Sequence, residues 1–313
     1  MTDPAALPHQ PVLVAEVLAG LNLQPGGRYL DATFGRGGHA AALLAALGPQ
    51  GRLLALDRDP AAQRDALARF KAETRFRFVR SAFSQLAERV HEQGWIGCVD
   101  GVLFDLGVSS PQLDDPARGF SFGRDGPLDM RMDPETGISA AAWLAQVSAT
   151  ELERVLAIWG EERFHRRVAR MLLAARQQAP IVTTARLAEL VAAAVPTREP
   201  GRHPATRTFQ AIRIAVNGEL SELQAGLAQA VRVLAPGGRL VAISFHSLED
   251  RMVKHFMRTQ AHGRELPLDL PVRGGPEGAT LRLVGRAVRP GAAEITTNPR
   301  ARSAVLRTAE RLM

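Results

Sequence analysis

The first hundred residues alternate short apolar runs with helix-like segments, and no other feature constrains the fold of this chain as strongly. We expect strands at residues 29–33, 52–57, 75–79 and 99–106. Helical patterns separate the first three of these runs, and the run at 99–106 is apolar enough to be buried on both faces. Strands that alternate with helices indicate a parallel sheet covered by helices. The sequence therefore predicts an α/β fold.

After this region the alternation stops. Residues 111–136 are dense in glycine, proline and aspartate and are expected to form a long ordered loop. Residues 139–195 are alanine-rich and helical throughout, with Ser148 and the pair Thr183-Thr184 as candidate N-caps. This pattern predicts a helical insertion within the α/β domain.

Toward the end of the chain the α/β pattern returns. A helix is expected at 209–234, a turn at 235–238 and a strand at 239–244, whereas 262–293 looks loop-like. The predicted domains are a first part of the α/β domain at 1–112, the helical insertion at 113–209, and a second part of the α/β domain at 210–313.

Composition points to a polyanionic partner. The 313 residues carry a formal net charge of +7 and a pI near 10.8, and 46% of them are apolar. Lys71 and Lys254 are the only lysines, so arginine supplies nearly all the positive charge. Arginine binds phosphate bidentately and stacks on bases, which suits RNA, although genomic base composition explains the bias equally well.

Cysteine usage and the absence of long apolar segments favour a cytoplasmic protein. Cys98 is the only cysteine, so no disulfide framework is possible, and its position before an apolar run suggests a core residue. We find neither a signal-peptide pattern nor an apolar run long enough to span a membrane. The histidines and the cysteine lack metal-ligand spacing, so no metal is expected.

The first expected strand leads into the glycine-rich stretch DATFGRGGH at 31–39, which then opens a helix. Gly35, Gly37 and Gly38 allow close approach of a ligand to the backbone, and the helix N-terminus from His39 adds free N–H donors. The spacing matches neither the dinucleotide pattern nor a P-loop. This stretch predicts a cofactor-binding turn, but by itself it does not identify the cofactor.

Polar and aromatic residues follow the other expected strands. Asp57 is placed to bind both hydroxyls of an adenosine ribose, with Asp31 nearer the amino-acid end of the cofactor. Phe83 is placed to flank an adenine ring, and Asp105 ends the fourth strand. These residues leave three alternatives open. Asp57 could cap the following helix, Phe83 could belong to the hydrophobic core, and the protein could be a NAD-dependent dehydrogenase.

Motifs along the whole chain resemble the bacterial 16S ribosomal RNA (cytosine-N4)-methyltransferase family. They are FDLGVSSPQLD at 104–114, GFSF at 119–122, GPLDMRMD at 126–133, WGEERF at 159–164, HPATRTFQ at 203–210, ISFHSLEDR at 243–251 and NPRARS at 298–303. Trp159 stands where many relatives have tyrosine, and 266–288 looks shorter than usual.

The resemblance implies a Rossmann-like class I methyltransferase sheet with an inserted all-helical domain. It also implies S-adenosyl-L-methionine as cofactor and N4-methylation of a cytidine in the decoding centre of 16S ribosomal RNA. The expected partner is this RNA within the small ribosomal subunit. The cofactor site would comprise Gly35, Gly37, Gly38, His39, Asp57, Phe83, Asp105 and Gln112. A monomer or a homodimer is compatible with the sequence.

For catalysis we expect Asp105, with a backbone carbonyl of the following loop, to accept hydrogen bonds from N4. Asp105 could instead hold the cofactor's amino group. DNA amino-methyltransferases use an Asp/Asn-Pro-Pro-aromatic loop here, which this chain lacks. Ser109 and His246 complete the candidate catalytic set, and Phe245 and His246 are candidates for contact with a base removed from its stack. Phe245 as core and His246 as a helix cap are equally compatible.

Two arginine clusters suggest phosphate contacts. They comprise Arg198, Arg202, His203, Arg207 and Arg213, and Arg300, Arg302, Arg307 and Arg311. Of these, Arg207, Arg300 and Arg302 are the candidate RNA contacts. The competing functions are a methyltransferase for a small molecule or protein, and a non-catalytic RNA-binding protein that keeps the cofactor fold.

Overall fold

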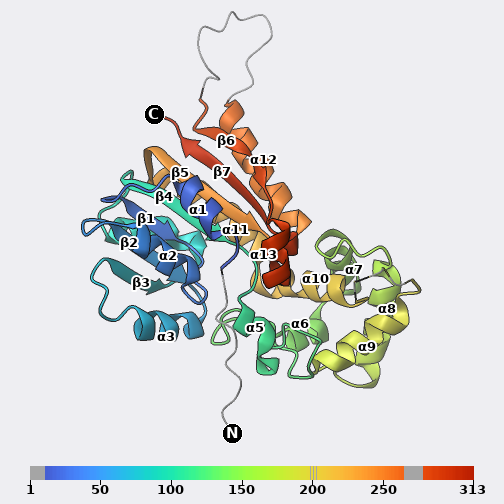
Figure 1. The fold of residues 1–313 in the computed structure, drawn as a ribbon. Coiled ribbons are helices and arrows are strands. Elements are labelled where there is room, and N and C mark those ends of the chain that lie inside the picture. The colour runs from blue at the N-terminus through green and yellow to red at the C-terminus, as the bar shows by residue number, and fades with distance from the viewer. Residues whose placement is uncertain (1–10, 198, 200, 202, 264–277) are drawn as a thin grey trace, which may run out of the picture. The chain divides into compact units, whose positions relative to one another are not determined.

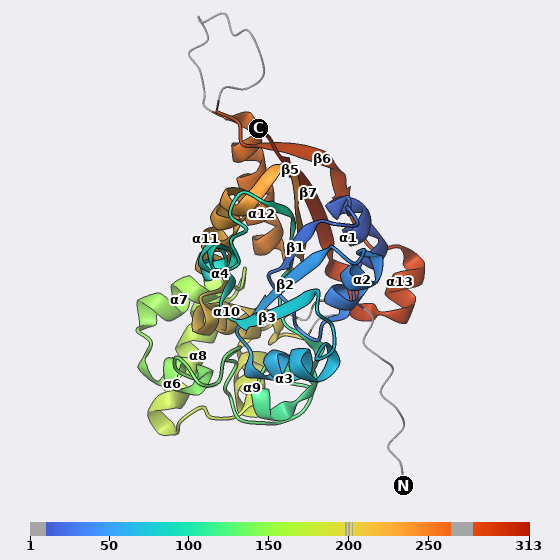
Figure 2. The ribbon, with the colours of Figure 1, turned by 90° about the vertical axis from the view of Figure 1, so that its left-hand side faces the viewer.

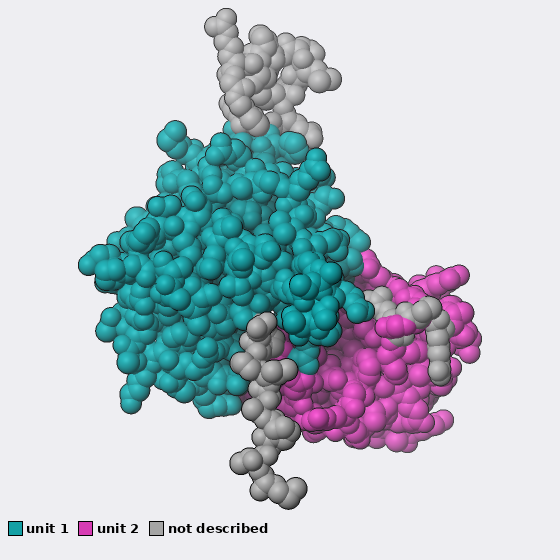
Figure 3. Space-filling model, in the orientation of Figure 1, with its two compact units in different colours: residues 1–107, 221–313 teal, residues 108–220 magenta. Residues whose placement is uncertain are grey.

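The computed structural model describes residues 11–197, 199, 201, 203–263 and 278–313. The chain forms two compact units (Figure 3). The sheet unit comprises residues 1–107 and 221–313, and the helical unit comprises residues 108–220. Among the described helices, none is both long and apolar enough to cross a membrane.

A seven-stranded sheet forms the centre of the sheet unit (Figure 1). Its strands are β1 (Arg28–Asp31), β2 (Arg52–Asp57), β3 (Phe76–Arg80), β4 (Val99–Asp105), β5 (Leu234–Ser244), β6 (Leu281–Val288) and β7 (Val305–Arg311). Their order is β3-β2-β1-β4-β5-β7-β6. The first five strands are parallel, and β7 runs antiparallel to both β5 and β6.

Helices cover both faces of this sheet (Figures 1 and 2). They are α1 (Val14–Leu21), α2 (Gly38–Ala46), α3 (Pro60–Arg69), α4 (Leu86–Glu92), α11 (Glu219–Val233), α12 (Ser247–His262) and α13 (Ala292–Thr297), with short 3₁₀ turns η1 (Phe83–Gln85) and η3 (Pro299–Ser303). Alternate strand residues face opposite sides, as a pleated strand requires. In β5, Leu240 packs with α4, α11 and α12, whereas Val241 packs with α1, α2 and α3.

The α/β class predicted from the sequence is confirmed, but the end of the chain is more regular than predicted. The loop-like assignment of 262–293 is wrong at Leu281–Val288, where β6 lies, whereas the described residues 278–280 and 289–291 are loop as predicted. The remainder of that stretch, 264–277, lies outside the described residues. β5 begins at Leu234, so the expected turn at 235–238 falls within the strand. Cys98 is exposed rather than core.

The helical unit contains no strand among its described elements. They are α5 (Ser110–Asp114), η2 (Pro116–Arg118), α6 (Ala140–Gln146), α7 (Ala149–Ile158), α8 (His165–Gln178), α9 (Thr184–Ala194) and α10 (Thr206–Asn217). Ser148 and Thr183 are N-caps whose side chains accept N–H bonds from α7 and α9. Leu144, Leu152 and Leu187 belong to a separate apolar core within this unit.

The boundaries of this unit differ from those expected. The predicted boundary at 209/210 falls within α10, which packs against α6 and α7 of the helical unit. The Gly- and Pro-rich stretch at 111–136 forms two short helices and a loop held by Asn217. Its side chain accepts from Met132 N and donates to Met130 O, each at 2.7 Å.

Candidate cofactor and catalytic site

Four strands of the sheet unit end in polar residues at the same edge of the sheet. β1 ends at Asp31, β2 at Asp57, β4 at Asp105 and β5 at Ser244. Because these strands are parallel neighbours, their carboxyl ends meet, which is where open α/β sheets bind ligands. The sequence-predicted acids Asp31, Asp57 and Asp105 therefore share one edge of the sheet.

The glycine-rich turn between β1 and α2 is held in one conformation. Gly37 has φ +72°, and a Cβ there would lie 2.6 Å from Phe34 Cζ. Phe34 N donates to Leu56 O at 2.9 Å, and Gly37 N donates to Phe34 O at 2.8 Å. The turn is thus tied to β2, and only glycine fits at its tightest point.

Asp57 links this turn to the end of β2. One carboxylate oxygen accepts from Gly35 N at 2.8 Å, and the other accepts from Asp59 N at 2.9 Å. The cap of α3 is Asp59, which accepts from Ala61 N, so the alternative of Asp57 as the helix cap is wrong. Burial raises the pKa of Asp57 to about 6, although both backbone N–H bonds oppose the shift.

His39 contacts Asp105 and interacts with the charge of Asp31. It is buried at the start of α2, and its Nε2 is 3.4 Å from Asp105 Oδ2. Asp105 is fixed through its backbone, since its N–H donates to Thr33 Oγ1 at 2.6 Å. Thr33 was not singled out in the sequence, although it lies directly within the glycine-rich motif.

The pKa values of Asp31 and His39 are both raised. Burial raises the pKa of the fully buried Asp31 to about 7, against the opposing charge of His39. For His39, burial alone would lower the pKa, but the bond and charge of Asp105 and the charge of Asp31 raise it. Titratable groups with shifted pKa values that gather at the carboxyl ends of strands are typical of functional sites.

Phe83 follows β3 and lies half-buried in η1. Its ring meets Phe104 edge-on, with centroids 5.5 Å apart, and lies against α11 at Gly226. The residue therefore packs on the core with part of its ring exposed. Adenine contact by that exposed part stays a prediction.

The turn after β5 places Phe245 and His246. Phe245 is half-buried, and its ring lies 3.4 Å from where a Cβ on Gly107 would be. His246 is the N-cap of α12, where its Nδ1 accepts from Glu249 N at 3.4 Å. Glu249 in turn accepts from Phe245 N at 2.9 Å. Sequence reasoning missed Glu249, although a cap followed three residues later by Glu is a capping-box signal.

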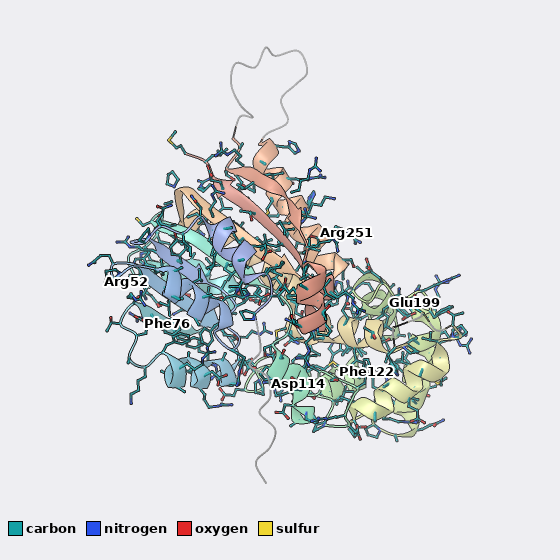
Figure 4. The ribbon with its side chains drawn as sticks, in the orientation of Figure 1. Arg52, Phe76, Asp114, Phe122, Glu199 and Arg251 are labelled. Carbon is teal, nitrogen blue, oxygen red and sulfur yellow. The ribbon has the colours of Figure 1, made fainter. Side chains whose placement is uncertain are left out.

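Ser109 and Gln112 belong to the helical unit. They form a capping box at the start of α5, where Ser109 N donates to Gln112 Oε1 at 2.9 Å. The helix ends at Asp114, which Figure 4 labels. In this structure both side chains organise α5, and their catalytic and cofactor roles stay predictions.

Two arginines of the predicted basic cluster in the helical unit pair with acids. Arg207 pairs with Glu199 at 2.7 Å, and Arg213 pairs with Glu219 at 2.7 Å. His203 stacks on Phe122 with ring centroids 4.4 Å apart (Phe122 and Glu199 are labelled in Figure 4). Arg198 and Arg202 lie outside the described residues.

The arginines of the second cluster differ in exposure. Arg300 and Arg302 are exposed on η3 in the sheet unit. Arg307 instead makes two bonds to Asp250, at 2.7 and 3.0 Å. Because they are exposed, Arg300 and Arg302 stay candidates for RNA contact, as predicted from the sequence.

Several polar atoms at the carboxyl ends of the strands could bind a ligand. Among the described residues, Asp31 Oδ2, His39 Nδ1 and Asp105 Oδ1 are buried without a hydrogen-bond partner. Unsatisfied buried polar atoms are costly in a folded protein, so their gathering beside a glycine turn fits a bound polar cofactor. These carboxylates suit an adenosine that carries an amino acid, because they can accept hydrogen bonds from its hydroxyl and ammonium groups.

Comparison with known proteins decides the family. The sequence model of the MraW methylase family matches residues 6–312. The chain belongs to the MraW methylase family.

Relatives of this MraW-family chain align over nearly its whole length. The "Ribosomal RNA small subunit methyltransferase H" of Thioalkalivibrio sulfidiphilus is 58% identical and covers 100% of both chains. The protein of that name from Thiobacillus denitrificans is 56% identical over 97% of each chain. Among solved structures, an rRNA methylase from Streptococcus thermophilus has a TM-score of 0.43 at 11% identity, over 98% of this chain and 100% of that one.

Membership of the MraW methylase family confirms the recognition made from the motifs. It also confirms that the chain is an enzyme, namely a methyltransferase. S-adenosylmethionine, the cofactor implied by the resemblance, is the methyl donor. A NAD-dependent dehydrogenase is thereby excluded.

Proposed function

We propose that the chain methylates N4 of a cytidine in the decoding centre of 16S ribosomal RNA, with S-adenosylmethionine as donor. The observation that carries this proposal is the 58% identity over the full length to a relative named for methylation of small-subunit ribosomal RNA. The bacterial cytoplasm, where ribosomes assemble, is the proposed location. The proposed substrate is the small ribosomal subunit or its RNA.

Residues at the strand edge support cofactor binding. S-adenosylmethionine supplies an electrophilic methyl group on a sulfonium. Asp57, already tied to the glycine turn through Gly35 N, keeps acceptor capacity on both oxygens for ribose hydroxyls. Asp31 is the candidate acceptor for an ammonium group, because its Oδ2 is buried without a partner among the described residues.

Asp105 is the proposed acceptor for the target amine. The lone pair of cytosine N4 is delocalised into the ring, so acceptors on its protons make it more nucleophilic. Asp105 Oδ2 faces His39, which leaves the unpartnered Oδ1 for an N4–H. The Thr33 bond fixes the backbone from which this carboxylate extends, and positioning of reacting groups is the main contribution of the protein.

Phe245 is the proposed platform for the base. It directly follows β5, and its ring borders Gly107, two residues beyond Asp105. A half-buried ring at this edge offers an apolar face to a base taken out of its stack. The carboxylate of Glu249 holds the backbone N–H of Phe245, so the ring is attached to a fixed turn.

The test is transfer of tritium from labelled S-adenosylmethionine to unmodified small subunits and to naked 16S RNA, followed by nucleoside analysis. Label in N4-methylcytidine supports the proposal. Absence of label in both substrates, with cofactor binding intact, would instead favour a small-molecule or protein substrate.

The role of Asp105 is tested by Asp105→Asn. We expect kcat to fall about 100-fold, because the variant replaces a charged acceptor with a weaker one. The dissociation constant for S-adenosylmethionine, measured by calorimetry, separates the two roles. A change in affinity alone assigns Asp105 to the cofactor, and a variant with unchanged turnover and affinity would eliminate both roles.

A further inference from the structure

A basic groove lies at the far edge of the sheet from β3, between α12 and the edge strand β6. It has a volume of about 230 Å³ and is lined by Lys254, Met257, Arg258, Leu283, Val284, Gly285, Arg286, Ala287, Arg307 and Thr308. Four of these residues are cationic and none is acidic. Lys254 is one of two lysines in the chain, and the cofactor and base-binding residues described above do not include any of this lining.

Three of the four cations keep their charge available. Arg307 is neutralised by its two bonds to Asp250. The nearby Glu310 is occupied by Arg239 and Arg282. For Lys254, Arg258 and Arg286, no carboxylate partner lies within salt-bridge distance among the residues that the structure describes.

Local backbone geometry brings these three charges to one groove. Lys254 and Arg258 are four residues apart on α12 and therefore share one face of the helix. On β6 the pairing with β7 is interrupted between Val284 and Val288, where Gly285 has φ +67°. This bulge takes Arg286 out of the regular ladder and leaves it exposed at the groove.

We propose that the α12–β6 groove binds the phosphodiester backbone of the RNA substrate, as a second contact apart from the site at the strand ends. This rests on the proposed function. Three cations that have no acidic partner within the described part of the chain match a run of phosphates, and phosphate contacts contribute much of the affinity for nucleic acids. The bulge disfavours the main alternative, continuous strand pairing with a second copy of the chain, because it interrupts the exposed edge.

The test compares two triple variants that each remove three positive charges. The groove variant is Lys254→Gln, Arg258→Gln and Arg286→Gln. The control is Arg64→Gln, Lys71→Gln and Arg77→Gln, three exposed cations on or beside α3 and β3, at the opposite edge of the sheet. Both triples remove two arginines and one lysine, so net charge and composition are matched.

Binding of unmethylated 16S RNA is measured by filter retention over a range of KCl concentrations, with methyl transfer assayed in parallel. We expect the groove variant to lose roughly tenfold to hundredfold in affinity at about 0.1 M KCl, with a salt slope shallower by about 2. The KM for RNA should rise while kcat and S-adenosylmethionine affinity stay at the wild-type values. The control triple should bind RNA nearly as tightly as wild type.

Equal behaviour of the groove and control triples would overturn the inference. A groove variant that changes from dimer to monomer in sedimentation, with RNA affinity unchanged, would assign the groove to a second copy instead. If the groove triple unfolds early on heating, the single variant Arg286→Gln, exposed on the bulge, carries the test. Failure of the wild-type enzyme to methylate RNA would refute the proposed function, and is thus distinguishable from these outcomes.

Discussion

Two aspartates separated by one residue do different work at the end of β2. Asp59 caps α3, whereas Asp57 accepts from Gly35 N and thereby shapes the cofactor turn. We expect Asp57→Asn to weaken S-adenosylmethionine binding about 10- to 100-fold, because bonds to a charged acceptor contribute about 1.5–3 kcal/mol. Asp59→Asn is the control, since asparagine caps helices as well as aspartate does. Calorimetric affinities that are equal for the two variants would contradict the assignment.

The buried cluster gives the free energy of unfolding a distinct pH dependence. The pKa of Asp31 rises on folding from 3.8 to about 7, so its neutral form is the one that folding favours. Stability from this group is complete below pH about 4 and is lost as pH rises toward about 7. His39, whose pKa is also raised, acts in the same direction.

The variant Asp31→Asn isolates this contribution, because it stays neutral at every pH. Urea unfolding at pH 5 and pH 8 should show wild type losing stability relative to the variant, by about 2–4 kcal/mol. Parallel pH profiles for the two proteins would show that Asp31 does not titrate as the structure implies.

Single residues were predictable where the local sequence decides their role. The acids at the ends of β1, β2 and β4 follow from apolar runs that stop at a carboxylate. Arg207 pairs with Glu199, and His203 stacks on Phe122. These contacts depend on the tertiary structure, so the sequence, which predicted a phosphate-binding cluster there, could not reveal them. Cys98 is exposed because it precedes β4 in a turn and not in the strand itself.

At the scale of an element, the turn before α2 depends on Gly37. We expect Gly37→Ala to cost about 1–3 kcal/mol of stability and to abolish tight cofactor binding, because the new Cβ would meet Phe34 at a positive φ. Gly94→Ala is a matched control, since Gly94 has φ +68° with nothing within 4 Å of the added Cβ. It tests the backbone cost alone, by thermal unfolding and by calorimetry with S-adenosylmethionine.

Gly94→Ala should keep wild-type cofactor affinity with a small loss of stability. If both glycine variants bind the cofactor equally well, close approach at Gly37 is not required for binding.

Elements with strong apolar periodicity were predicted, and weakly patterned ones were not. The central strands β1, β2 and β4 are buried and read directly from the sequence. β6 is an edge strand whose residues are mostly exposed, so LRLVGRAV gives no continuous apolar signal. It pairs with β7 over long sequence separations, from Leu281 with Arg311 to Val288 with Leu306. Such long-range pairing cannot be predicted from local sequence periodicity.

At the scale of the whole molecule, the proposed function makes the placement of positive charge testable as a determinant of RNA binding. We expect the double variant Arg300→Gln and Arg302→Gln to raise the KM for RNA and to reduce the salt slope of binding by about 1.5. kcat at saturating RNA should be unchanged, since neither side chain belongs to the strand-edge cluster. Arg64→Gln with Arg77→Gln is the charge-matched control, and an equal loss in both doubles would indicate a general charge effect only.

The path of the chain through the sheet has a consequence for synthesis on the ribosome. β4 and β5 are hydrogen-bonded neighbours, with Asp105 opposite Ile243, yet the entire helical unit is made between them. The nascent β4 must therefore wait, with one edge unpaired, until more than a hundred further residues have emerged. Because the helical unit has a core of its own, it can fold during that interval. Translation pauses within residues 108–220 should thus prolong exposure of an unfinished, aggregation-prone sheet.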